Sequence, residues 1–158
     1  MRFKLIFVCV IILAVAGIAI ARANSPSLHE KHPKHTAIVY KTPTCGCCAN
    51  FVGYLRTQNY DIEVVDLSQE ALTKKKRELG VPASLDSCHT TVAKEGYFVE
   101  GHIPYEAINK LLAEKPDIKG IGMPGMPSAS PGMPGSKTAP FDISQVSADG
   151  RVRPYITL

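Results

Sequence analysis

The sequence has 158 residues, enough for one domain with appendages but not for two catalytic domains. Its formal net charge is +4, yet the first 23 residues hold three of the basic residues and no acidic one, so the remainder carries +1. A near-neutral chain lacks the electrostatic footprint of a nucleic-acid-binding protein. We expect its one dense basic run, residues 74–77, to be a solvated helix face.

Residues 1–23 have the pattern of a secretory signal peptide. Positive charge at Arg2 and Lys4 precedes an apolar run over residues 5–21, and Ala21-Arg22-Ala23 supplies a small-residue cleavage site. An uncleaved membrane anchor is the alternative, since a spanning helix needs about 20 apolar residues. We predict cleavage after Ala23 and a periplasmic protein, which would contact a membrane only through an uncleaved leader.

Beyond the leader, alternating strand and helix patterns predict one α/β domain. Residues 24–35 are polar and indicate a flexible arm that carries His29, His32 and His35. The β-rich residues 36–40 end before Pro43, and apolar spacing at i, i+4 then favours a helix. The expected elements are a strand over 36–40, a helix over 49–56, a strand over 62–67, a helix over 69–79 that Gly80 stops, a hairpin over 90–93 and 97–100, and a helix that opens at Pro104.

This βαβαββα order is that of a thioredoxin-like domain, which we place at residues 36–119 in the α/β (α+β) class. Another small α+β fold is the alternative, because a sequence does not display strand order or handedness. Residues 120–140 form a Gly/Met/Pro-rich strap, whose part from 120 to 135 should form neither a regular helix nor a central strand. Residues 141–158 predict a C-terminal β-hairpin, and whether it extends the sheet is open.

Four cysteines remain after the leader, with Cys45, Cys47 and Cys48 in one cluster and Cys88 beside His89. An oxidising compartment permits two disulfides in three connectivities. Cys45 and Cys48 have the C-x-x-C spacing of a dithiol redox centre, and a helix N-terminus there would stabilise thiolates. Cys47 adds a third soft ligand, and it cannot bridge the adjacent Cys48 without backbone strain.

Metal binding is the second chemistry that the cysteines indicate. In a thioredoxin-like arrangement the loop after Val81-Pro82 faces the active-site helix, so Cys88 and His89 would meet the first three thiols. Thiolates select Cu(I), Zn(II) or iron–sulfur clusters, and an added imidazole suits copper or zinc. Three close sulfurs also favour bridging, which allows more than one ion. His102 is a further candidate ligand, although a single histidine is more often a surface or capped residue.

Thioethers and histidines outside the cluster are accessory candidates. Met123, Met126 and Met133 lie in Gly-Met-Pro repeats and offer soft ligands that survive oxidising conditions, so they could hand over Cu(I). For each of them, an apolar strap on the domain surface is the alternative. His29, His32 and His35 could collect metal, and a solvated tail is the alternative for these.

In combination these motifs closely resemble the exported CopG-type copper-resistance proteins of bacteria. The resemblance covers nearly all of the chain after the leader. It implies a thioredoxin-like fold, a cysteine-bridged copper site and redox handling of periplasmic copper. Phe51 stands where a tryptophan would be expected, which should alter packing rather than ligation. The matching segments are 40–48 (YKTPTCGCC), 80–82 (GVP), 87–90 (SCHT), 96–97 (GY), 100–104 (EGHIP), 124–127 and 130–133, and the ligands implied are Cys45, Cys47, Cys48 and Cys88, with His89 and His102 in addition.

The sequence therefore predicts a periplasmic copper-binding protein for copper resistance that holds Cu(I) in its thiolate cluster. Cycling between Cu(I) and Cu(II), and contact with other periplasmic copper-handling or redox proteins, are further expectations. The alternatives are a thiol–disulfide oxidoreductase that uses Cys45 and Cys48, and a Zn(II)-binding or disulfide-stapled interaction domain. Whether the protein is a copper-dependent oxidoreductase is open, because no flavin, haem or nucleotide motif would supply electrons.

Overall fold

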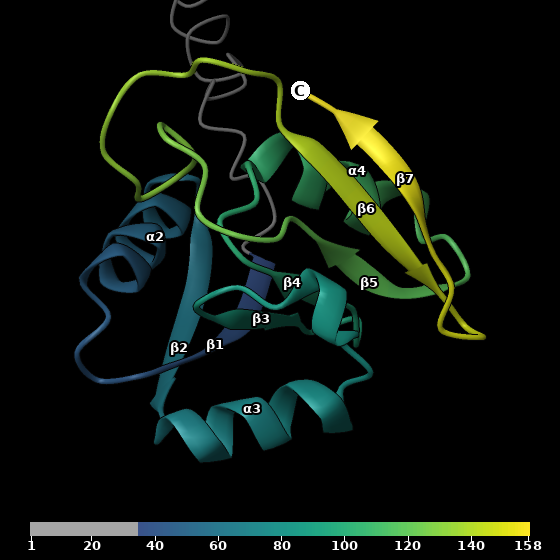
Figure 1. Ribbon diagram of the computed structural model, residues 1–158, viewed down its shortest axis with the longest axis horizontal. Helices are drawn as coiled ribbons and strands as arrows, with labels where there is room; N and C mark the ends of the chain where they lie inside the picture. Colours follow the sequence, from purple (N-terminus) through teal and green to yellow (C-terminus); the bar gives the residue numbers. More distant parts are fainter. Residues whose placement is uncertain (1–34) are drawn as a thin grey trace, which may run out of the picture. The chain divides into compact units, whose positions relative to one another are not determined.

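The computed structural model describes residues 35–158, which fold around one seven-stranded mixed sheet (Figure 1). The strands are β1 (His35–Lys41), β2 (Tyr60–Asp66), β3 (Thr90–Ala93), β4 (Phe98–Glu100), β5 (Ile118–Gly122), β6 (Asp142–Ser147) and β7 (Val152–Thr157). The helices are α2 (Gly46–Thr57), α3 (Gln69–Glu78) and α4 (Tyr105–Glu114), with a 3-10 turn η1 (Ala83–Leu85). The strand order is β2-β1-β3-β4-β5-β6-β7.

Two crossover helices connect parallel strands in this sheet. α2 joins β1 to β2, which pair in parallel along their whole length, and α4 joins β4 to β5, which also pair in parallel. The other pairs are antiparallel, including β1 with β3 and the β3–β4 hairpin. The α/β class and the βαβαββα order of elements up to α4 are confirmed.

Side chains on the two faces of the sheet form separate cores. Val99 belongs to the larger core, which α2 and α4 cover, while its neighbour Phe98 belongs to a smaller one. Because successive strand residues point to opposite faces, the two cores lie on opposite sides of the sheet. Leu79, directly after α3, packs against the smaller core. The larger core therefore joins the sheet to the helix that carries the cysteines.

The expectation that residues 120–135 cannot form a central strand is wrong for their first three residues. β5 lies between β4 and β6 in the interior of the sheet. Gly120 pairs with Phe98, and a Cβ at Gly120 would lie 2.2 Å from the Phe98 carbonyl oxygen and 2.6 Å from its Cγ. The missing side chain makes room for the aromatic ring, so this glycine permits the strand rather than breaking it.

The C-terminal hairpin extends the sheet. β6 pairs antiparallel with β5, and β7 pairs antiparallel with β6 to form the outer edge, as Figure 1 shows in yellow-green and yellow. Pro154 lies in β7, and an edge strand is where a sheet tolerates proline. Among residues 35–158, no helix is long and apolar enough to cross a membrane. The predicted leader and His29 and His32 lie outside the described residues.

Candidate metal centre

The cysteine cluster occupies the start of α2, at the end of β1. The helix begins at Gly46, three residues before the predicted start, so Cys45 is its N-cap residue and Cys47 and Cys48 lie in its first turn. The first N–H groups of a helix have no intrahelical partner and attract negative charge. No acidic residue lies in this turn, so a thiolate would be the anion closest to these groups.

Four sulfur atoms converge at this helix end. Cys45 and Cys48 form a disulfide, and Cys47 and Cys88 are free thiols. The Cys47 Sγ lies 3.5 Å from the Cys45 Sγ and 3.9 Å from the Cys88 Sγ. All four sulfurs lie within 4.8 Å of one another. The fold therefore brings Cys88 to the three clustered cysteines, about 40 residues away along the chain.

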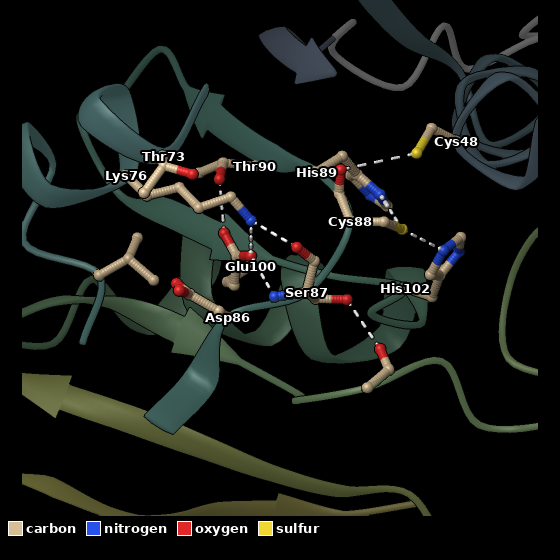
Figure 2. A network of polar contacts seen from close by, with 12 residues as sticks. Cys48, Thr73, Lys76, Asp86, Ser87, Cys88, His89, Thr90, Glu100 and His102 are labelled. Atoms are coloured by element: carbon tan, nitrogen blue, oxygen red, sulfur yellow. Dashed lines mark hydrogen bonds and ion pairs between the residues drawn. The ribbon is translucent and has the colours of Figure 1, made fainter. Parts of the chain in front are cut away.

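Two imidazoles lie close to the Cys88 sulfur (Figure 2). The His102 Nε2 is 3.0 Å from the Cys88 Sγ, and the His89 Nδ1 is 3.5 Å from it. One donor atom from each of Cys88, His89 and His102 lies within 4.8 Å of the other two. Both rings are fully buried and meet edge to face, with centroids 4.7 Å apart. Cys88 thus belongs to two sets of donors. We call Cys45, Cys47, Cys48 and Cys88 the sulfur group, and Cys88, His89 and His102 the imidazole group.

A backbone carbonyl of the strap fixes the proton of His102. The Pro131 carbonyl oxygen lies 2.7 Å from the His102 Nδ1, and a carbonyl can only accept a hydrogen bond. The Nδ1 therefore carries the proton and donates it, which leaves the Nε2 lone pair directed at the Cys88 sulfur. A hydrogen bond of this kind is what orients a metal-binding histidine.

His89 is less fully hydrogen-bonded than His102. Its ring packs against Phe51, with centroids 4.4 Å apart, and its Nε2 has no hydrogen-bond partner among the described residues. A buried polar atom without a partner costs about 1–3 kcal/mol of stability. The nitrogen that faces the Cys88 sulfur is the other one, Nδ1.

Burial controls the protonation states of the imidazole group. Desolvation raises the pKa of the Cys88 thiol to about 12, and the neighbouring Cys47 adds to the rise. Desolvation also lowers the pKa of His102, and it lowers that of His89 well below the ordinary value, with His102 and Lys76 contributing. Both imidazoles are therefore neutral at pH 7, while Cys88 must lose a proton when it binds a metal.

A buried ion pair holds the loop that carries Cys88 and His89 (Figure 2). The fully buried Glu100 carboxylate accepts hydrogen bonds from the Ser87 N–H at 2.7 Å, from the Thr90 hydroxyl and from the Lys76 ammonium. The Lys76 Nζ also donates to the Ser87 carbonyl oxygen at 2.6 Å. The residues on both sides of the Cys88-His89 pair are therefore fixed to one carboxylate.

The expectation of a solvated basic run is wrong for Lys76, which is only 2% exposed. Lys76 follows the buried Leu72 by four residues and so shares its face of α3. This spacing was the available signal for its burial. For Glu100, which follows Phe98 and Val99 in a short strand, the residues themselves carry no sign of an ion pair.

The strap packs against the cysteine helix and the Cys88 loop. A Cβ on Gly132 would lie 2.7 Å from the Phe51 N and 2.8 Å from the Cys47 carbonyl oxygen. The Ser87 hydroxyl donates to the Gly125 carbonyl oxygen at 2.7 Å. Apart from its first strand residues, the strap has no helix or strand, yet it contacts both sides of the sulfur group.

The accessory candidates differ widely in position. Met123 is 2% exposed and belongs to the larger core, Met126 is 51% exposed, and Met133 is half-buried. Met123 therefore has a packing role. His35 begins β1 and stacks near Tyr60, at the end of the strand opposite the cysteines. The structure thus separates His35 from the sulfur group by the length of a strand.

The donor atoms present suit a soft or borderline metal. Thiolates and imidazoles bind Cu(I), Cu(II) and Zn(II), whereas hard ions take oxygen ligands. The disulfide removes Cys45 and Cys48 as thiolate donors until two electrons reduce it. The full sulfur group is therefore a ligand set of the reduced protein.

Comparison with known proteins relates the chain to copper resistance. Two solved structures of copper resistance protein CopG, form 2 and form 1, are each 32% identical to it, with TM-scores of 0.71 and 0.70. The first match covers 79% of this chain and 98% of the other, and the second covers 78% and 96%. A family model described as a protein of unknown function, DUF411, matches residues 85–133. No curated protein matches the chain.

Proposed function

Because the chain belongs to the family of copper resistance protein CopG, we propose that it binds Cu(I) through its reduced cysteines and thereby contributes to copper resistance. The observation that carries this proposal is the convergence of four sulfur atoms within 4.8 Å of one another. Such a set offers more thiolates than one Cu(I) ion needs, and sulfurs this close can bridge neighbouring ions. More than one ion per chain is therefore part of the proposal.

The dithiol pair supports redox cycling of the copper. Cys45 and Cys48 are close enough to form a disulfide in the structure. Two thiols and two Cu(II) ions would give one disulfide, two Cu(I) ions and two protons. Cys47 and Cys88 would remain as thiols to hold the Cu(I) produced. A small-molecule or protein dithiol would then reduce the disulfide and restore the full sulfur group.

The proposed place of action is the periplasm, on the strength of the signal-peptide pattern over residues 1–23. Thiols in an oxidising compartment need a reductant, so the proposal includes other periplasmic redox or copper-handling proteins as partners. Met126, the exposed thioether of the strap, is a candidate contact for incoming Cu(I).

A thiol–disulfide oxidoreductase is the second candidate function. The observation in its favour is the Cys45–Cys48 disulfide at the N-terminus of α2, where the helix end stabilises a thiolate leaving group. A Zn(II)-binding or disulfide-stapled interaction domain uses the same residues. Cys88 separates these functions, because a simple dithiol does not need it.

The test is copper retention by the reduced protein. We would load it with Cu(I) under anaerobic conditions, desalt it, and measure copper content and free thiols on the same sample. Retention of one or more ions per chain with all four thiols protected, and loss of copper in Cys88→Ser, would support the proposal. Full copper retention in Cys88→Ser would overturn it. A copper-free protein with reversible oxidation of Cys45 and Cys48 would favour the oxidoreductase.

A further inference from the structure

We propose that Phe51 is a positioning residue, which holds the His89 ring in the orientation that directs its Nδ1 to the Cys88 sulfur. The sequence predicts a role for Phe51 in packing rather than ligation, and in the structure the rings that it packs against include both imidazoles. The orientation of His89 in the metal-free protein is independent of the proposed function, and only its value for copper binding rests on that function.

Phe51 reaches the imidazoles from the same helix that carries the cysteines. It lies in α2 one turn after Cys47 and Cys48, and its side chain is fully buried. The strap contacts its backbone closely, because a Cβ at Gly132 would lie 2.7 Å from the Phe51 N and 3.1 Å from its Cα. The aromatic ring therefore projects into the core from a backbone that is packed against the strap.

The Phe51 ring and the two imidazoles contact one another in pairs. The centroids of Phe51 and His89 are 4.4 Å apart, with 42° between the ring planes. Phe51 and His102 meet edge to face at 5.7 Å, and the two imidazoles meet edge to face at 4.7 Å. Aromatic pairs attract one another at separations of about 4.5–7 Å. Each ring thus limits the rotation of the other two, and the shortest of the three separations is that between Phe51 and His89.

Packing matters more for His89 than for His102, because the two rings differ in their hydrogen bonds. The His102 Nδ1 donates to the Pro131 carbonyl oxygen at 2.7 Å, and this bond orients that ring directly. Among residues 35–158 the His89 Nε2 has no hydrogen-bond partner, and its Nδ1 lies 3.5 Å from a sulfur, a weak donor and weak acceptor. The orientation of His89 therefore depends on the side chains packed around it.

A flat ring can rotate about its Cβ–Cγ bond only where its neighbours leave the space that its edges sweep. Protein interiors are packed as densely as organic crystals, and the fully buried His89 has the Phe51 ring against it. Phe51→Leu would leave a gap on that side, because a core relaxes only partly around a smaller side chain. The His89 ring should then rotate, so that Nδ1 faces the sulfur for only part of the time.

Under the proposed function, this rotation would weaken metal binding without removing a donor atom. For any metal-bound form that uses the His89 Nδ1, the apparent dissociation constant rises as the inverse of the fraction of molecules with that nitrogen in place. Equal population of two orientations would raise it only about twofold. The test therefore observes the ring itself rather than the bound metal.

The experiment compares both rings by NMR in the full metal-free chain, with isotope-labelled histidine and the Cys45–Cys48 disulfide closed. The parent chain should give one set of His89 ring signals, with nuclear Overhauser contacts to the Phe51 ring. Phe51→Leu should give a second set or exchange-broadened signals for His89, while the signals of His102 stay single. Phe51→Tyr, which keeps the aromatic ring, should retain the single set.

Leu55→Ala is the matched control for a merely loosened core. Leu55 is fully buried and follows Phe51 by four residues on the same face of α2, so this variant should destabilise the protein and leave the His89 signals single. A single orientation in Phe51→Leu, or a second one in Leu55→Ala, would overturn the proposal. If Phe51→Leu does not fold, the parent chain decides, because exchange of its His89 ring between orientations would also overturn it. Failure of Cu(I) loading would leave these results unchanged.

Discussion

Lys76 and Glu100 form a fully buried ion pair directly behind the loop that carries Cys88 and His89. Lys76 comes from α3 and Glu100 from the end of β4, so the pair links a helix to the sheet next to the Cys88 loop. Its carboxylate also accepts hydrogen bonds from both sides of the loop. The stability of the fold and the position of Cys88 thus depend on the same two charges.

Replacing Lys76 with methionine should destabilise the protein strongly. Removing one partner of a buried ion pair leaves the other charge unpaired, which costs about 3–5 kcal/mol. Lys75→Met is the matched control, because the Lys75–Glu78 pair is solvent-exposed and water screens its attraction. The measurement is the free energy of unfolding in urea. Equal losses in the two variants would contradict the prediction.

The loss in Lys76→Met should shrink in acid. Desolvation already raises the pKa of Glu100, and Lys76 is the chief influence that opposes the rise. A raised pKa in the folded state gives stability that is present at low pH and is lost as pH rises through that pKa. Without Lys76 the pKa rises further, so neutral Glu100 removes the unpaired charge at mild acid pH. Unfolding free energies at pH 7.5 and 5.0 should show a smaller difference from the parent chain at pH 5.0, and a larger one would refute the assignment.

Cys88 should react slowly with alkylating agents in the metal-free, disulfide-closed protein. Its pKa of about 12 leaves on the order of one thiol in ten thousand ionised at pH 8, and the thiolate is the nucleophile. The alkylation rate should therefore rise about tenfold per pH unit between pH 8 and 10. Mass spectrometry of the labelled peptide measures this rate. A plateau below pH 9 would show an ordinary thiol.

Gly132→Ala should displace the strap, whereas Gly125→Ala should not. Both glycines have left-handed backbones, with φ of +84° and +72°, so each substitution costs about 1–2 kcal/mol. A Cβ at Gly132 would also lie 2.7 Å from the Phe51 N, while none of the surrounding atoms lies within 4 Å of one at Gly125. The steric overlap should add about 1–3 kcal/mol, measured by urea unfolding. Equal costs would mean that the strap moves freely away from α2.

Much of the site could be inferred once a thioredoxin-like arrangement is expected. In that arrangement, a strand that ends before Cys45 and a loop that follows Val81-Pro82 bring Cys88 to the first three cysteines. The predicted start of α2 is three residues too late because Gly46 and Cys47 have weak helix propensity, and the preceding turn at Thr42 fixes the start instead.

Long-range pairing accounts for what the sequence did not reveal. Lys76 lies among basic neighbours, and its burial depends on Glu100, which is 24 residues away. Gly120 has the composition of a loop, and its place in a central strand depends on the Phe98 ring. The proton position on His102 depends on a carbonyl 29 residues away. In each case the deciding partner belongs to a different element.

The contact between Pro131 and His102 has a consequence for how the strap can vary. The group that accepts the His102 proton is a main-chain oxygen, which every amino acid possesses. The orientation of that imidazole is therefore encoded in the path of the chain and not in the identity of residue 131. A different side chain at this position would leave the hydrogen bond in place, provided that the loop follows the same course, whereas a shorter or longer loop would move the carbonyl away from the His102 Nδ1.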